Sequence, residues 1–106
     1  MASELANGSQ TAVISTEHTL DTRSAVGTYQ LLVDLSNMVN GDVLELRVYV
    51  KARNAEGSDK LHQFSTYSHK QTTVIAASVP VLCAYCHFTL KQTAGTGRAF
   101  PWSVLG

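Results

Sequence analysis

The residues best placed to do chemistry are two cysteines and a histidine in the string Cys83-Ala84-Tyr85-Cys86-His87. The spacing C-x-x-C-H matches the signature for covalently attached c-type haem, in which two thiols hold the porphyrin and the histidine binds the iron. Side chains that could supply a second iron ligand are scattered along the chain: Met38, His18, His62 and His69. A haem site therefore has to be weighed against a purely structural role for the string.

The pattern around this string opposes a cofactor site. Residues 81–93 alternate between apolar and polar side chains, which predicts one extended strand. In such a strand Cys83 and Cys86 face opposite ways with their Cα atoms roughly 10 Å apart, too far for a disulfide. A structural zinc site needs four ligands, more than the string supplies. We therefore expect Cys86 to be a small buried apolar residue, Cys83 to be a thiol on the other face, and the protein to hold no cofactor or metal.

The remaining polar residues form no recognisable catalytic pattern. Serines and histidines are present, but there is no nucleophile elbow. The acidic residues Asp34, Asp42, Glu45 and Asp59 are spread over predicted strand ends and loops, which fits solvated or ion-paired carboxylates better than a calcium site or a glycosidase pair. Residues 95–98 are too few, and lack the strand-to-helix setting, for a phosphate-binding loop. The sequence therefore predicts a protein that is not an enzyme.

Composition narrows the class of partner. At 106 residues the chain is expected to form a single domain. Charged residues make up 15%, against roughly 25% in an average soluble protein. Such a lightly charged surface suits contact with other protein, although a small all-β domain that covers its exposed faces with Thr, Ser and Gln would have the same composition. Eight basic residues balance eight acidic ones, which disfavours nucleic acid as the main partner.

Neither a membrane segment nor a secretory signal is expected. The longest apolar run, residues 79–85, is interrupted by Pro80 and is too short to span a bilayer. Residues 1–7 have no basic start followed by an apolar stretch, so no secretory signal is visible. We therefore expect the protein to be made in a cytosol, with both thiols reduced.

Two alternating segments within residues 28–52 predict a hairpin around which the fold is organised. Period-two alternation is typical of half-buried strands, and Asn40 and Gly41 in the connection at residues 36–42 can take the positive φ that a chain reversal needs. Leu32 is an apolar residue on the otherwise polar face of the first segment, which we interpret as a contact residue. The side chains predicted to point inward are Tyr29, Leu31, Val33, Leu35, Leu44, Leu46, Val48 and Val50.

The rest of the chain predicts further short strands and no helix. Residues 1–10 are small and polar and are expected to be a flexible N-terminal arm. Pro101 in the last segment argues for an edge strand, in which Trp102 closes the core. The other predicted strands cover residues 11–20, 60–69, 72–78, 81–93 and 99–105. About seven strands at this spacing predict an all-β fold, a two-sheet antiparallel β-sandwich of jelly-roll or immunoglobulin-like type, in one domain over residues 11–106.

Two stretches of the sequence resemble known proteins. Residues 34–49, with Asp34-Leu35-Ser36-Asn37-Met38 and Gly41-Asp42-Val43-Leu44, and residues 90–102, ending in Arg98-Ala99-Phe100-Pro101-Trp102, resemble small tailed-phage virion proteins of the capsid decoration (cement) type. That resemblance implies a β-sandwich or jelly-roll structural protein that binds and stabilises the assembled capsid. It also implies a virion location, with the major capsid protein or other virion subunits as partners, and leaves a tail or neck position open.

A decoration protein needs a broad contact surface rather than a pocket, and flexible ends that become ordered on neighbouring subunits. A homo-oligomer would strengthen binding through effective concentration. An alternative is a carbohydrate-binding or adhesion module, for which Tyr49 and Tyr85 are the tyrosines expected to face outward. The residues predicted to contact a partner are Leu5, Gln10, Leu32, Tyr49, Arg53, Glu56, Arg98, Phe100 and Trp102.

Overall fold

The structure, a computed structural model, describes residues 3–53 and 55–106. Within these residues every regular element is a strand. No helix that could cross a membrane occurs in this part of the chain. The nine strands of the described residues are β1 (Glu4–Thr11), β2 (Glu17–Arg23), β3 (Gly27–Asp34), β4 (Val43–Val50), β5 (Lys60–Ser68), β6 (Ile75–Ala77), β7 (Val81–Cys83), β8 (Cys86–Ala94) and β9 (Ala99–Leu105).

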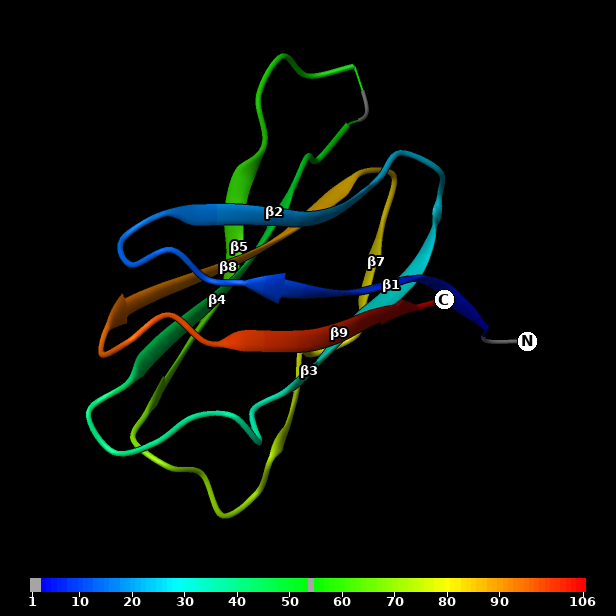
Figure 1. Ribbon diagram of the computed structural model, residues 1–106. Helices are drawn as coiled ribbons and strands as arrows, with labels where there is room; N and C mark the ends of the chain where they lie inside the picture. The colour runs from blue at the N-terminus through cyan, green and yellow to red at the C-terminus, as the bar shows by residue number, and fades with distance from the viewer. Residues whose placement is uncertain (1–2, 54) are drawn as a thin grey trace.

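The strands form two antiparallel sheets (Figure 1). Sheet A has the order β1-β9-β3-β6, with β7 also pairing with β3, and sheet B has the order β2-β8-β4-β5. The molecule measures 41 × 30 × 18 Å, and its short dimension fits two layers stacked about 10 Å apart with side chains on their outer faces. The predicted all-β antiparallel sandwich is confirmed, with nine strands rather than about seven.

The strand pairs are nested. Strand β1 pairs with β9, β2 with β8, β3 with both β6 and β7, and β4 with β5, all antiparallel. The chain is therefore one long antiparallel hairpin rolled up so that successive pairs fall in alternate sheets. Its tip is the loop between β4 and β5, seen at the top of Figure 1. This nested order is the topology of a jelly roll.

The prediction that residues 28–52 form a hairpin is wrong, although both of the predicted strands exist. Strand β3 lies in sheet A and β4 in sheet B, and each pairs with other strands. Their connection crosses from one sheet to the other, and Leu35 and Met38 within it are only 1% exposed. Alternation identifies the buried face of each strand but carries no information on which strand lies beside it. Gly41 does have the positive φ expected of this connection, at 98°.

The prediction of a single strand over residues 81–93 is also wrong, because these residues fall in two strands. Strand β7 pairs with β3 in sheet A, whereas β8 pairs with β2 and β4 in sheet B. Ala84 and Tyr85 carry the chain between the sheets, and the backbone bends at Ala84. The alternation of side chains therefore does not continue from Cys83 to Cys86, and the prediction that these two residues face opposite ways loses its basis.

From Glu4 onward the N-terminal segment is a strand, where the sequence predicted a flexible arm. Residues Glu4–Thr11 pair with β9, while residues 1–2 of the predicted arm lie outside the described residues. A Cβ atom at Gly8 would lie 3.2 Å from the ring of Trp102, so the absence of a side chain leaves room for the indole. The strand predicted over residues 11–20 is shifted as well, since Thr11 ends β1 and Glu17 begins β2.

Pro101 does not mark an edge strand. Strand β9 lies between β1 and β3. The ladder between β9 and β3 ends at the pair of Trp102 with Val33. Pro101, the preceding residue of β9, is therefore not paired with β3. The missing N–H of the proline therefore falls beyond the last pair of that ladder, where it removes no hydrogen bond.

The core lies between the two sheets and draws on both. Phe88 from sheet B and Phe100 from sheet A are fully buried, and Leu44, Leu46 and Val48 are between 0% and 7% exposed, as their alternation predicts. Trp102 is half-buried against this core. The buried apolar residues are Ala12, Tyr29, Leu31, Val33, Leu35, Met38, Leu44, Leu46, Val48, Ala76, Val81, Cys86, Phe88, Leu90, Phe100 and Val104.

Candidate binding surfaces

The outer face of sheet A has an apolar hollow. Leu32 lies opposite Ser103 of β9 and Ala77 of β6, and directly opposite residues of antiparallel strands share a face. A hollow of about 360 Å³ opens over these strands. Its lining residues are Leu32, Val33, Asp34, Ile75, Pro101, Trp102 and Ser103. The outward position predicted for Leu32 is confirmed.

Two more apolar side chains lie beyond the hollow on this face, among uncharged polar side chains such as Thr28, Gln30 and Asn7. Leu105 lies opposite Gln30, and Leu82 lies opposite Thr28, which is on the same side of β3 as Leu32. Ile75 is 51% and Leu82 75% exposed. The charged residues that strand register puts on this face, among the described residues, are Glu4 and Asp34, both acidic. We call this surface, made of Leu32, Ile75, Leu82, Pro101, Leu105 and their neighbours, the apolar face.

The outer face of sheet B is different because several of its charged and polar side chains bind one another. At its centre the Glu17 Oε2 atom accepts hydrogen bonds from the Tyr49 hydroxyl at 2.7 Å and the Thr89 hydroxyl at 2.6 Å. Burial acts to raise the pKa of Glu17, but these two bonds and the positive charge of Arg47 outweigh it and hold the pKa below its ordinary value. Burial and the bond to Glu17 raise the pKa of Tyr49. We call this surface the polar face.

His87 extends the polar face toward its neighbouring strands. Its Nδ1 atom lies 3.0 Å from Asp59 Oδ2, its Nε2 atom lies 3.1 Å from the Thr19 hydroxyl, and its ring stacks on Tyr49 with 5.0 Å between centroids. A carboxylate, an imidazole and a hydroxyl in this order also occur in hydrolase triads. Thr19 however lies in an extended strand, whose N–H groups run in the sheet plane and not toward the hydroxyl, so its own backbone offers no oxyanion hole.

Two cations complete the polar face by lying on aromatic rings. Arg47 donates from Nη2 to Glu45 at 2.8 Å and lies 4.5 Å from the centroid of the Phe64 ring. Its Nη1 atom is buried and has no hydrogen-bond partner among the described residues. Lys51 lies 4.3 Å from the centroid of the Tyr85 ring. The exposed aromatic groups of this face are thus tied to charged neighbours.

The C-x-x-C-H string does not gather into a metal or haem site. The Cys83 and Cys86 thiols are free and contact each other on the inner side of the sandwich, contrary to the predicted opposite facing. Burial, with Cys83 next to it, raises the pKa of Cys86 far above its ordinary value. His87 points to the outer face, toward Asp59 and Thr19. Nowhere in residues 3–53 and 55–106 do three or more His, Cys, Asp or Glu side chains come together as a metal site would require.

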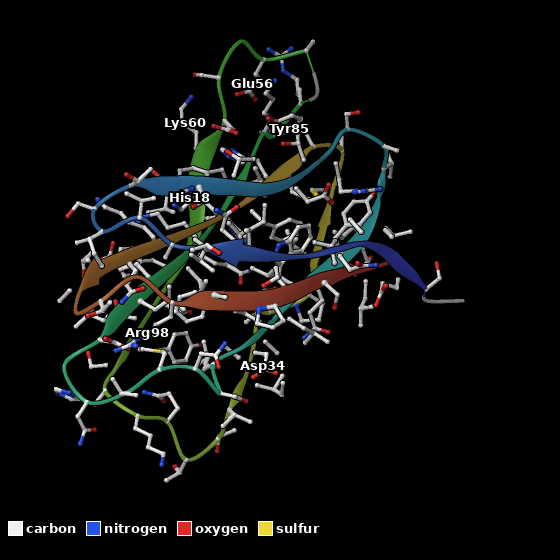
Figure 2. The ribbon with its side chains drawn as sticks, viewed as in Figure 1. His18, Asp34, Glu56, Lys60, Tyr85 and Arg98 are labelled. Atoms are coloured by element: carbon white, nitrogen blue, oxygen red, sulfur yellow. The ribbon has the colours of Figure 1, made fainter. Side chains whose placement is uncertain are left out.

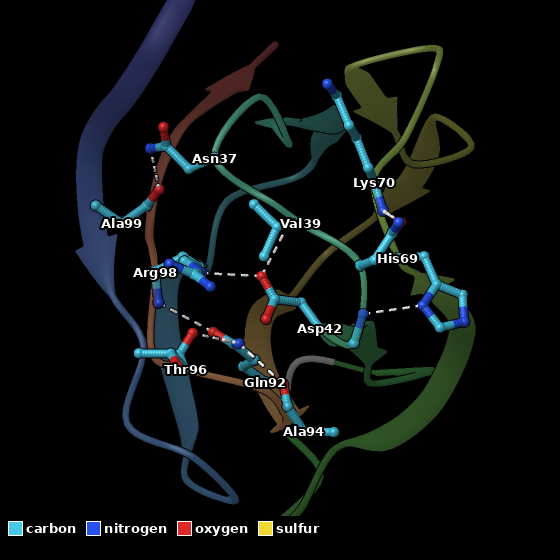
Figure 3. A network of polar contacts seen from close by, with 12 residues as sticks. Asn37, Val39, Asp42, His69, Lys70, Gln92, Ala94, Thr96, Arg98 and Ala99 are labelled. Atoms are coloured by element: carbon cyan, nitrogen blue, oxygen red, sulfur yellow. Dashed lines mark hydrogen bonds and ion pairs between the residues drawn. The ribbon is translucent and has the colours of Figure 1, made fainter.

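One end of the sandwich is closed by an ion pair between the buried Asp42 and the partly exposed Arg98 (Figure 3). Asp42 is 1% exposed, and its Oδ2 atom accepts hydrogen bonds from Arg98 Nε and from the Val39 N–H, both at 3.0 Å. Burial acts to raise the pKa of Asp42, but the Val39 N–H and the Arg98 guanidinium hold it below its ordinary value. A Cβ atom at Gly95, where φ is 90°, would collide with the Asp42 carboxylate. The pair therefore has a structural role.

Gln92 supports the same end of the molecule from within β8. It is fully buried, and its Nε2 atom donates to the carbonyl oxygens of Ala94 at 3.0 Å and Thr96 at 2.8 Å. Its Oε1 atom accepts the Arg98 N–H at 3.1 Å, as the dashed lines of Figure 3 show. One amide thus satisfies three backbone groups of the turn that leads to β9. Sequence patterning indicated no role for this residue.

The nine predicted contact residues do not form one surface. Leu32 and Trp102 line the hollow of the apolar face. Leu5 is 37% exposed on β1, and Gln10 is half-buried, donating to the Thr11 carbonyl at 3.0 Å. Phe100 is fully buried, so its side chain is not at the surface and the prediction of contact there is wrong.

The other predicted contact residues lie at separate places. Arg53 and Glu56 belong to the loop at the tip, where the Arg53 N–H donates to the Glu56 carboxylate at 3.1 Å; Asn54 between them lies outside the described residues. Figure 2 shows Glu56 at the end of the molecule away from Arg98. Arg98 pairs with Asp42, and Tyr49 belongs to the polar face.

Comparison of the chain with protein-family models, with curated proteins and with solved structures finds no match.

Proposed function

We propose that this protein is a non-enzymatic structural subunit that binds and stabilises an assembled capsid, as a phage decoration or cement protein, and that it docks through its apolar face. The observation that carries the proposal is the contrast between the two outer surfaces. Leu32 and Ile75 line a hollow of about 360 Å³, and Leu82 adds exposed apolar area beyond it, whereas on the polar face Glu17 and Arg47 are held by neighbouring side chains.

Other features support the same proposal. Exposed contiguous apolar surface on a small domain is typical of protein contact sites, and the hollow could take an anchoring side chain of the partner. Glu4 and Asp34 are the charged groups of the apolar face, so a capsid surface with lysine or arginine near an apolar projection would be complementary. Jelly rolls recur in viral capsid and lectin domains, an analogy of fold that is compatible with this role.

The proposal can be tested by comparing virions made with and without the gene for this protein. The protein should co-purify with virions and raise their survival on heating or osmotic shock. Leu32→Asp should abolish binding to particles that lack the protein, because it introduces a charge into the hollow, while Thr66→Asp on the exposed outer side of β5 should bind as the wild type does. Absence of the protein from particles, together with unchanged particle survival, would refute the proposal.

Carbohydrate binding on the polar face is the second candidate function. The observation that favours it is the Tyr49–His87 stack, with 5.0 Å between ring centroids, beside the carboxylates of Glu17 and Asp59. Aromatic faces and carboxylates together suit the apolar faces and hydroxyls of a sugar. Hits on a glycan array that are lost in Tyr49→Ala and retained in Leu32→Asp would favour it, and an array without hits would remove it.

A further inference from the structure

We propose that β1 is a self-association edge, at which two copies of the protein pair antiparallel so that sheet A continues across a two-fold axis. The proposal names a surface and a partner, a second copy of this chain. It rests on the side of β1 that pairs with no other strand of the described residues, and it does not depend on the capsid role proposed above.

The hydrogen-bonding register of β1 shows which backbone groups face outward. The Ala12 N–H donates to the Arg98 carbonyl at 2.9 Å, and Gln10, Gly8 and Ala6 follow at every second position opposite Phe100, Trp102 and Val104. In an antiparallel ladder the residues between these turn their N–H and C=O groups the other way. Asn7, Ser9 and Thr11 therefore direct these groups away from β9, and the Thr11 carbonyl accepts the Gln10 side chain.

The other edges of the two sheets have features that hinder pairing. Strand β2 carries a register shift between Thr19 and Asp21 and the charged residues Glu17, Asp21 and Arg23. Strands β6 and β7, which both pair with β3, have only three residues each. Strand β5 starts with the charged residue Lys60. Its Gln63 side chain donates to the Val79 carbonyl and accepts the Val79 N–H, both at 3.0 Å. Charges, bulges, shortness and cover are the usual means by which proteins blunt a sheet edge.

Strand β1 lacks these features over most of its length. Its register shift lies at the start, between Glu4 and Ala6, and residues 6–11 contain no charged residue and no proline. Such a stretch is open to pairing with another strand. Antiparallel pairing of two copies about Asn7 would put the Asn7 backbone groups of each copy opposite those of the other. Glu4 is the charged residue of β1 and would then lie opposite uncharged Gln10, so no like charges meet.

A second copy is the occupant that fits this edge best. A two-fold axis normal to the sheet keeps the outer side of both copies on one side, so the two apolar faces would lie on the same side of the dimer, separated by the polar side chains of the paired β1 strands. The edge strand of another protein could pair in the same way, and the experiment distinguishes that case because it uses the purified full-length chain alone.

Ser9→Pro is the decisive variant. The Ser9 N–H points away from β9, so proline removes a donor from the free edge and leaves the internal ladder intact. Sedimentation equilibrium of the wild type should show a monomer–dimer equilibrium. In Ser9→Pro the dissociation constant should rise about tenfold or more, since each copy loses a backbone hydrogen bond. The matched control Ser9→Thr keeps the N–H and should dimerise as the wild type does.

Amide exchange of the wild-type protein supplies a measurement that does not require a variant to fold. The Asn7 and Ser9 amides should exchange more slowly as the protein concentration rises, while the Gly8 and Gln10 amides stay protected at every concentration. A protein that stays monomeric into the millimolar range, or a dimer in which the Asn7 and Ser9 amides exchange as fast as in the monomer, would overturn the proposal.

Discussion

The Asp42 carboxylate lies 3.0 Å from Nε of Arg98, although 56 residues separate them in the chain. This part-buried contact joins the crossing between β3 and β4 to the turn before β9, and so fixes two connections between the sheets at the same end of the molecule. Its charge makes that end sensitive to acid.

Asp42→Asn should destabilise the protein by about 2 kcal/mol at pH 7, because hydrogen bonds to a charged group are lost or weakened. The pKa of Asp42 is lowered by folding. Its carboxylate therefore stabilises the fold above the unfolded-state pKa of about 3.9, and that contribution disappears as the pH falls through the folded-state pKa. Urea unfolding should show a smaller loss of stability with acid in the variant, and an unchanged acid dependence would contradict this account.

Gln92→Ala should cost about 3 kcal/mol, since it creates a cavity at a fully buried position and leaves the Ala94 and Thr96 carbonyls and the Arg98 N–H without this partner. The comparison is Gln71→Ala, whose side chain bonds the Ser68 carbonyl at the surface at 2.8 Å. That change should cost less than about 1 kcal/mol. Equal urea midpoints for the two variants would mean that the Gln92 amide is not the group that holds the turn.

Phe100→Ala should destabilise by about 3–5 kcal/mol because the ring is fully buried between the sheets. Phe64 is a matched control, 48% exposed beneath Arg47, and its replacement by alanine should cost about 1 kcal/mol or less. Thermal unfolding compares the two. A small effect at Phe100 would show that its position is open to solvent, as the sequence-based contact prediction required.

Cys83 should react with a water-soluble thiol reagent in the folded protein, whereas Cys86 should react only after unfolding. Cys83 is partly exposed and Cys86 fully buried, with burial raising the pKa of the latter, and the thiolate is the reactive form. Mass spectrometry of native and denatured samples would count the modified thiols. Modification of Cys86 in the native protein would contradict the structure of the β7–β8 crossing.

The sequence predicted the buried faces of β3 and β4 well because alternation reports burial directly. Leu44, Leu46 and Val48 are buried where their period places them, and Leu32 faces outward. Alternation does not predict which strands pair with each other. Strand β4 carries the same pattern whether it pairs with β3 or with β5, and only the rest of the fold decides between them.

The polar face was beyond sequence reasoning for a related reason. Glu17, Tyr49 and Thr89 lie on three strands that meet only when β8 sits between β2 and β4. A pattern within one strand puts Tyr49 on the outside but does not reveal the carboxylate that binds its hydroxyl. The contact of Cys83 with Cys86 was missed because a short crossing interrupts an otherwise regular alternation.

The position of β9 in the middle of sheet A has a consequence for biosynthesis. Strands β1 and β3, which it joins, are both synthesised long before residues Ala99–Leu105. A growing chain can close the β4–β5 tip early, but it must keep the edges of β1 and β3 exposed until its last strand is made. Translational pausing or truncation shortly before Ala99 would therefore leave two unprotected strands and an aggregation-prone nascent protein.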